Sequence, residues 1–249
     1  MPSTRPPSPP LPASPATGQS GTDLQMVWDA LVFMQVPGTV NRVTDMLQQA
    51  GARMQRGAAF HPTEVRRLMG DLAAAGRVKM DERGAWHPEP AQAWQRFGEL
   101  VNDAQLRQRW WTGWRAHSRF DNAWHLELFT ETALVGAVRV VVFGGRSLAG
   151  FERLSALSRN PSPEHPVVLA QALLMPFDEA LWASLDPELQ LHLLRGLLTL
   201  PMGDTESVTA PLWDWLLAQT RPQPGRLHDF ARRALALHLL FCDQSAEAR

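Results

Sequence analysis

The sequence predicts a mainly α-helical protein with one β-hairpin, preceded by an unstructured tail. Three observations lead to this fold class. Apolar residues recur at helical spacing through most of the 249 residues. The stretch "AAAGRVKMDERGAWHPEP", residues 73–90, looks like the end of a helix followed by two short strands around a turn. The first sixteen residues contain seven prolines and almost no large apolar side chain. We therefore expect a tail at 1–21, a first folded unit at 22–90 and a second at 91–249.

The tail, "MPSTRPPSPPLPASPATGQSGT", cannot bury enough apolar surface to offset the entropy lost on ordering. We predict that it is disordered and partly of polyproline II conformation. It is a solvated leader, a proline-motif ligand or an unconventional secretion signal, and its composition leaves these alternatives open.

Composition restricts the function classes. The formal net charge is -1 and the pI is about 6.7, so no global basic field indicates a nucleic-acid binder. Cys242 is the only cysteine, which excludes disulfides within the chain and cysteine-based metal sites. No apolar run approaches the roughly 20 residues of a membrane helix, and no signal-peptide core is found at the N-terminus. We therefore expect a cytoplasmic protein that does not interact with membranes.

Arginine outnumbers lysine 23 to 1, which we attribute mainly to nucleotide composition and secondarily to guanidinium contacts.

Three helices are expected at the start of the first unit. The first runs to Met34, with Thr22 or Asp23 as its cap, and is broken by Pro37-Gly38. The second, "TVNRVTDMLQQAGAR", ends at Gly51. The third, "HPTEVRRLMGDLAAAG", has a proline in its first turn and ends at Gly76.

The hairpin of residues 77–88 follows the third helix directly. Three short helices and then a two-stranded hairpin is the chain order of a winged helix-turn-helix, and residues 22–90 resemble that superfamily in order, length and apolar spacing. The resemblance rests on this pattern, since no specific sequence motif carries it. It implies that the hairpin is the wing and packs beside the third helix.

The second unit is helical almost throughout. Its helical stretches are separated by short breaks of Gly, Pro, Asp or Asn: "AQAWQRFGELV", "AQLRQRWWTGWRAHSRF", "ETALVGAVRVVVF", "SLAGFERLSALS", "HPVVLAQALLM", "DPELQLHLLRGLLTL", "VTAPLWDWLLAQ" and "RLHDFARRALALHLLF". "VRVVVFGGRSLAGFERL" and "ALHLLFCDQSAEAR" share a weak internal similarity. We therefore predict an α-solenoid of irregular helix pairs.

A winged helix followed by helical repeats also resembles the N-terminal regions of large bacterial helicase-like ATPases of the switching/sucrose-non-fermenting class. The similar pattern of helical segments runs from "FHPTEVRRLMGDLAAAGRV" through "LLMPFDEALWASLDPELQLHLLRGLL" to "PLWDWLLAQ". The sequence departs from these proteins because it has no phosphate-binding loop, acidic ATPase box or arginine-finger motif. The resemblance therefore implies a region like the non-catalytic N-terminal part of these proteins, without the ATPase domain. No residue of this chain is assigned an ATPase role.

No constellation of catalytic residues emerges from the sequence. Phosphate-loop, dinucleotide-binding, zinc-protease and nucleophile-elbow patterns are all missing. Asp178, Glu179 and Asp186 stand at expected helix starts, where carboxylates favour the helix dipole. We predict no enzymatic activity, no cofactor and no metal site.

Nucleic-acid binding is the first functional expectation, with double-stranded DNA as the partner. In a winged helix the third helix enters the major groove and the wing reaches the backbone. The candidate contacts there are Thr63, Arg66, Arg67, Arg77, Lys79 and Arg83. Residues 22–90, however, hold eight Lys/Arg and eight Asp/Glu, and a neutral unit serves protein contacts equally well.

The segment "LRQRWWTGWRAHSRF" adds Arg109 and Arg115 to the candidate nucleic-acid contacts. Its tryptophans share one helical stripe, which indicates either a core seam with solvated arginines or an aromatic and basic platform for nucleic acid.

The alternative function is a protein-interaction scaffold. Leu237, Leu240 and Phe241 lie near the end of the sequence with little chain after them to cover them. We expect this edge to bind a partner, either an ATPase encoded separately or a second copy of the chain.

Overall fold

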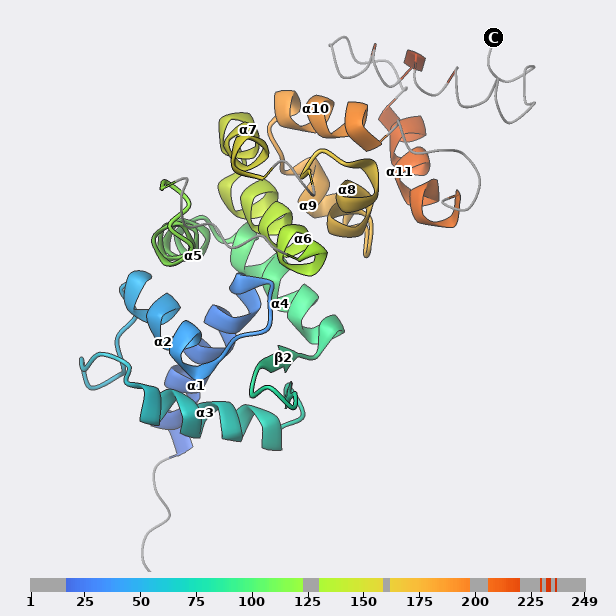
Figure 1. Cartoon of the computed structure of the whole chain (residues 1–249). Coiled ribbons are helices and arrows are strands. Elements are labelled where there is room, and N and C mark those ends of the chain that lie inside the picture. Colours follow the sequence, from blue (N-terminus) through green and yellow to red (C-terminus); the bar gives the residue numbers. More distant parts are fainter. Residues whose placement is uncertain are drawn as a thin grey trace, which may run out of the picture.

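The computed structural model describes residues 17–122, 130–158, 162–197 and 206–219, together with Asp229, Arg232, Arg233 and Ala236. Within them the chain is mainly α-helical, which confirms the predicted fold class at that level, and it contains one two-stranded sheet. The elements are α1 (Thr17–Met34), α2 (Val40–Gln49), α3 (Pro62–Ala74), β1 (Val78–Met80), β2 (Trp86–Pro88), α4 (Pro90–Asn102), α5 (Ala104–His117), α6 (Glu131–Arg139), the π-helical turn η1 (Val140–Gly145), α7 (Leu148–Leu157), α8 (Pro166–Leu173), α9 (Glu179–Ala183), α10 (Pro187–Leu197) and α11 (Glu206–Gln219). Figure 1 shows their arrangement.

The first helix begins earlier than the sequence predicts. It starts at Thr17, inside the segment assigned to the tail, so the expected cap at Thr22 or Asp23 is wrong. The last proline before the helix is Pro15, and no residue from there to Met34 blocks helical backbone hydrogen bonds. Asp23 instead accepts a hydrogen bond from the Gln55 amide, at 3.0 Å.

The next two helices end where the sequence predicts. Gly51 follows α2 with φ 64°, and Gly76 follows α3 with φ 71°. These left-handed conformations suit glycine and stop each helix. The α2 amino end is capped by the Thr39 hydroxyl, which accepts from the Arg42 amide at 3.4 Å.

The hairpin follows α3 directly, as expected. β1 and β2 are antiparallel, with Lys79 opposite His87 and Met80 opposite Trp86. Gly38, between α1 and α2, forms an additional bridge to Trp86 through two main-chain hydrogen bonds of 3.0 and 3.1 Å. The sheet is thereby tied to the α1–α2 connection, a contact that the sequence did not indicate.

The second unit contains the expected helices up to residue 219, with one difference, and most of the helix expected at 226–241 lies outside the described residues. The helix predicted over 131–143 becomes α6 followed by η1, where Gly144 and Gly145 pack closely against Phe33 and Trp111. A cis peptide bond precedes Pro176, and the short helix α9 follows Asp178, at one of the helix starts that the sequence predicts. α6 packs on α8, α8 on α10, and α10 on α7.

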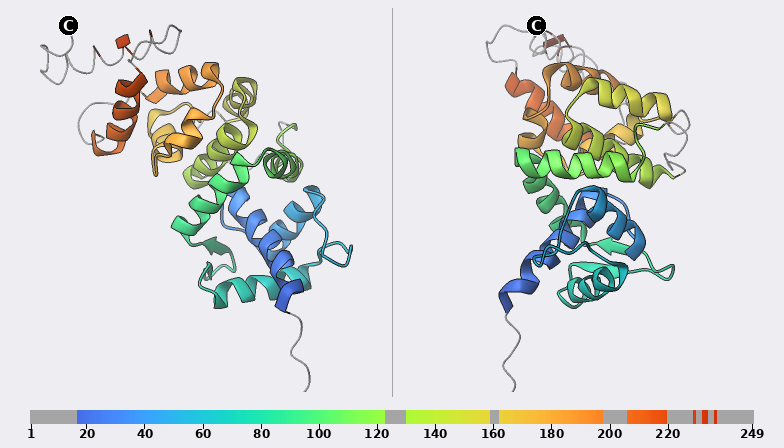
Figure 2. Two further views of the ribbon diagram at one scale, coloured as in Figure 1. Left: turned by 180° about the vertical axis from the view of Figure 1, so that it is seen from behind. Right: turned by 90° about the vertical axis from the view of Figure 1, so that its left-hand side faces the viewer.

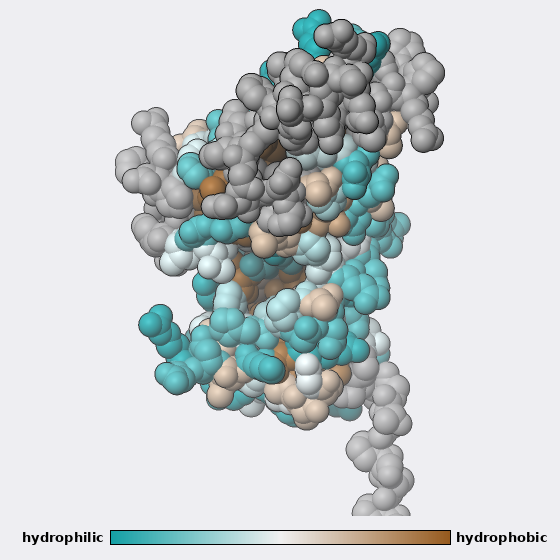
Figure 3. All heavy atoms as spheres, turned by 90° about the vertical axis from the view of Figure 1, so that its right-hand side faces the viewer, coloured by the Kyte–Doolittle hydropathy of each residue, from teal (hydrophilic) through white to brown (hydrophobic). Residues whose placement is uncertain are grey.

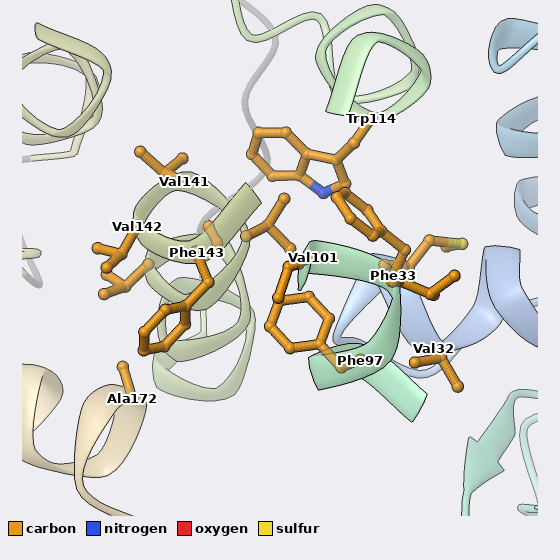
Figure 4. Packing of buried hydrophobic residues seen from close by; sticks show 14 of the residues in the cluster. Val32, Phe33, Phe97, Val101, Trp114, Val141, Val142, Phe143 and Ala172 are labelled. Carbon is orange, nitrogen blue, oxygen red and sulfur yellow. The ribbon is translucent and has the colours of Figure 1, made fainter. Parts of the chain in front are cut away.

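A single hydrophobic core runs through both units. Phe33 of α1 packs against Phe97 of α4, whose ring meets that of Phe143 with centroids 6.4 Å apart. Figure 4 shows these rings between α1, α4 and η1. The expected boundary near residue 90 therefore crosses continuous apolar packing.

The molecule is elongated, with α4 and α5 between a part made of α1–α3 and the hairpin and a part made of α6–α11 (Figure 2). One face has a hollow between these parts with hydrophobic residues at its bottom (Figure 3). The C-terminal edge residues Leu237, Leu240 and Phe241 lie outside the described residues.

Candidate nucleic-acid interface

The helix α3 has one buried face and one exposed face. Its apolar stripe is buried against α1 and α2 and consists of Val65, Leu68, Met69 and Leu72. Thr63, Arg66, Arg67 and Gly70 lie on the exposed face, as the sequence predicts. A Cβ built at Gly70 meets nothing within 4 Å, so this face is open around the glycine.

The hairpin extends the same exposed surface beyond the carboxyl end of α3. Val78 is buried, whereas Lys79 and Met80 are exposed. The Asp81 carboxylate accepts hydrogen bonds from the Arg83 and Ala85 amides and contacts the His87 ring at 2.9 Å. The hydrogen bonds from His87 and the Ala85 amide lower the pKa of Asp81. This carboxylate orders the turn that carries the exposed Arg83.

Two of the candidate arginines in this unit have intramolecular partners. Arg67 pairs with Glu64 at 3.3 Å and with Asp71 at 2.9 Å, both on α3. The Arg77 guanidinium lies over the Trp28 ring, 5.8 Å from its centroid, and is half-buried. Neither side chain is as available to a phosphate as its position in the sequence indicates.

Arg109 and Arg115 on α5 are engaged as well. Arg109 donates to the Ala50 carbonyl at 3.1 Å, and Arg115 binds both oxygens of Asp121 at 2.8 Å. Trp110 and Trp114 are buried, so they cannot stack on bases from the surface. These contacts favour the core-seam interpretation of this segment over the aromatic platform.

The charged side chains of residues 22–90 differ in whether they have intramolecular partners. Asp29 pairs with Arg96 at 2.8 Å and Asp45 with His117 at 2.5 Å, and both partners come from outside the segment. The Arg96 guanidinium has a raised pKa, mainly because of its hydrogen bonds to Asp29. Glu89 caps α4, and the remaining acids except Glu82 have the partners described above.

Six cations of the same segment have no side-chain hydrogen bond or ion pair to any described residue and are exposed. They are Arg42, Arg53, Arg56, Arg66, Lys79 and Arg83. Most acids of this segment are thus engaged in intramolecular contacts, whereas these six cations stay available to an anion from outside.

Sequence reasoning overlooked Arg53 and Arg56. Both lie in the loop between α2 and α3 and are not among the contacts predicted from the sequence. Two arginines three residues apart immediately before the expected third helix were the available signal.

The described residues give little support for a metal site or for acid–base catalysis by carboxylates. Among them, no three His, Cys, Asp or Glu side chains come together in a way that could hold a metal ion. Asp178 accepts from the Leu181 amide and Asp186 from the Glu188 amide, which confirms the capping interpretation of these carboxylates.

Comparisons with protein-family models, curated proteins and solved structures find no match for this chain. None of the described helices combines the length and apolar character that crossing a bilayer requires.

Proposed function

We propose that the chain is a non-enzymatic DNA-associated module that contacts duplex DNA through α3 and the β1–β2 hairpin. The observation that carries this proposal is the uneven pairing of charges. Arg66, Lys79 and Arg83 are exposed and have no side-chain partner in the part of the chain that the structure describes, while most acids of residues 22–90 are held in intramolecular contacts. Surplus surface cations release counterions from the phosphate backbone, which is the main source of sequence-independent DNA affinity.

The chain order supports a winged-helix interpretation of this unit. The Gly38 bridge to Trp86 supplies a third extended segment between the first two helices. The order is then helix, extended segment, two helices and two strands, as in a winged helix. In that arrangement α3 is the groove-reading helix and the hairpin is the wing.

The exposed face of α3 suits close approach to a duplex. Thirteen residues give a helix about 20 Å long, and the major groove is about 12 Å wide. Gly70 has no side chain at the middle of this face, so backbone and bases can come near it. Thr63 and Arg66 supply polar contacts on the helix, and Lys79 and Arg83 reach phosphates beside it.

We further propose that α6–α11 continue as a helical-repeat scaffold of the α-solenoid type in the cytoplasm. The packing of α6 on α8 and of α8 on α10 supports this stacking. The alternative, a scaffold for a protein partner through Leu237, Leu240 and Phe241, is an outcome of the test below.

The test is duplex binding by fluorescence anisotropy over a range of salt concentrations. The wild type is expected to bind at low salt. Arg66→Ala and Lys79→Ala should each lower the slope of log affinity against log salt by about 0.9. Arg195→Ala removes an exposed arginine from α10 and serves as the matched control, with a slope like that of wild type. A wild type that binds no duplex at low salt would overturn the proposal and favour the scaffold alternative.

A further inference from the structure

The loop between α2 and α3, residues 50–61, has its own ordered shape. Ala52 and Phe60 are fully buried at its two ends, and the Gln48 side chain donates to the Phe60 carbonyl at 3.0 Å. A turn in the middle is closed by hydrogen bonds from the Met54 amide to Ala58 and from the Gly57 amide to Met54, at 2.9 and 2.8 Å. Gly57 has φ 80°, which a glycine adopts without strain.

This turn is also fixed to α1. The Gln55 amide donates to the Asp23 carboxylate at 3.0 Å, across 32 positions of sequence. The Asp23 carboxylate accepts this backbone hydrogen bond and forms no ion pair with Arg53 or Arg56. Arg53 and Arg56 are exposed, and neither has a carboxylate partner among the described residues.

The chemistry of the loop surface favours an anion over a protein partner. Its exposed side chains are arginine, glutamine, histidine, alanine and glycine, and its larger apolar residues are buried or half-buried. Protein interfaces gain most of their affinity from large apolar or aromatic residues that become buried. Arginine forks bind phosphate in a bidentate manner without such a core.

We propose that this loop is a second phosphate-binding element, in which Arg53 and Arg56 hold the DNA backbone beside the amino end of α3. The proposal rests on the proposed function. The loop leads directly into α3 and the hairpin follows it, so exposed cations stand at both ends of the helix (Figure 1). A helix in the major groove has a phosphate backbone on either side of it, and cations at both ends contact both backbones.

The test compares full-length variants by anisotropy with a labelled duplex and with related duplexes of altered sequence. Arg53→Ala with Arg56→Ala should lower the salt slope by about 1.8, because two phosphate contacts are lost. The affinity lost between 50 and 200 mM salt should then be about tenfold smaller than for wild type. The ranking of duplex sequences should not change, because phosphate contacts carry no base information.

Two controls sharpen the experiment. Arg53→Lys with Arg56→Lys keeps both charges and should keep most of the salt slope, whereas Arg195→Ala removes a distant charge and should leave it unchanged. Circular dichroism checks that the variants retain the helical fold.

The two proposals fail in different ways. If wild type binds duplex and Arg66→Ala weakens it, but the double alanine variant keeps the wild-type slope, the loop inference is overturned and the proposed function stands. A loss of affinity with an unchanged slope would also overturn it, because the contact would not be to phosphate. Absence of any duplex binding by wild type overturns both.

Discussion

At the scale of single residues, the arginines explain much of how the helices are joined. Arg109 donates to Ala50 at the end of α2, Arg146 to Val101 at the end of α4, and Arg153 to Phe120 beyond α5. Arg139 donates to the Gln171 and Ala172 carbonyls of α8 and to that of Met175. The last carbonyls of a helix have no partner within it, and a guanidinium offers five donors and a positive charge to them. The guanidinium contacts that sequence analysis ranked second therefore have a structural role.

The first stability prediction concerns Arg139, whose pKa is lowered by burial. Arg139→Lys should lower the free energy of unfolding by about 1–3 kcal/mol, because an ammonium cannot satisfy the same set of carbonyl oxygens and some stay unpaired. Chemical denaturation measures this change. Arg195→Lys, the same substitution at an exposed site, should stay within about 0.5 kcal/mol of wild type. Equal effects at both positions would contradict the carbonyl-binding role.

At the scale of elements, the crossing of α2 and α5 depends on one glycine. A Cβ built at Gly113 would lie 2.6 Å from the Ala50 Cβ and 2.7 Å from its Cα, so the two helices are in backbone contact there. The His117–Asp45 pair and the Arg109 hydrogen bond to Ala50 join the same two helices. Close packing and polar contacts thus set the position of α5 against the first unit.

The second prediction uses this crossing. Gly113→Ala should destabilise the protein by about 1–3 kcal/mol through overpacking, although alanine is the better helix former. The matched control is Gly70→Ala on the exposed face of α3, where nothing lies within 4 Å. That substitution should stabilise the protein by about 0.5–1 kcal/mol. Thermal unfolding distinguishes the two, and a stabilised Gly113→Ala variant would show that α5 can move away from α2.

At the scale of the whole molecule, the first unit depends on helices that follow it in the chain. Phe33 packs against Phe97 and Trp110, and Asp29 is buried with Arg96 as its partner. Removing α4 and α5 would expose these rings and leave the carboxylate of Asp29 without its cation. The boundary at residue 90 therefore separates two segments of the chain, but it does not separate two parts that fold independently.

The third prediction follows from this dependence. A fragment of residues 17–90 should show poor dispersion in its amide NMR spectrum and no cooperative thermal transition. A fragment of residues 17–122 keeps α4 and α5 and should recover both properties. Cooperative unfolding of the shorter fragment would show instead that the first unit folds without them.

The sequence by itself determined the local features. Apolar spacing, Pro62 and the glycines at 51 and 76 predicted α2, α3 and the hairpin closely, because these signals act within a few residues. The start of α1 was placed too late because the polar residues 17–21 carry no apolar stripe. The π-helical turn was also missed, since its glycines pack against Trp111 and Phe33 of distant helices and no local signal marks that contact.

The candidate site was only partly predictable for the same reason. The sequence identified which residues face outward on α3, since helical periodicity determines a face. Only the tertiary structure decided which charged side chains of residues 22–90 have intramolecular partners. Asp29 pairs with Arg96 and Asp45 with His117, which lie 67 and 72 positions away. A count of charges along the chain cannot detect such pairs, because ionic contacts depend on distance in space and not on distance in sequence.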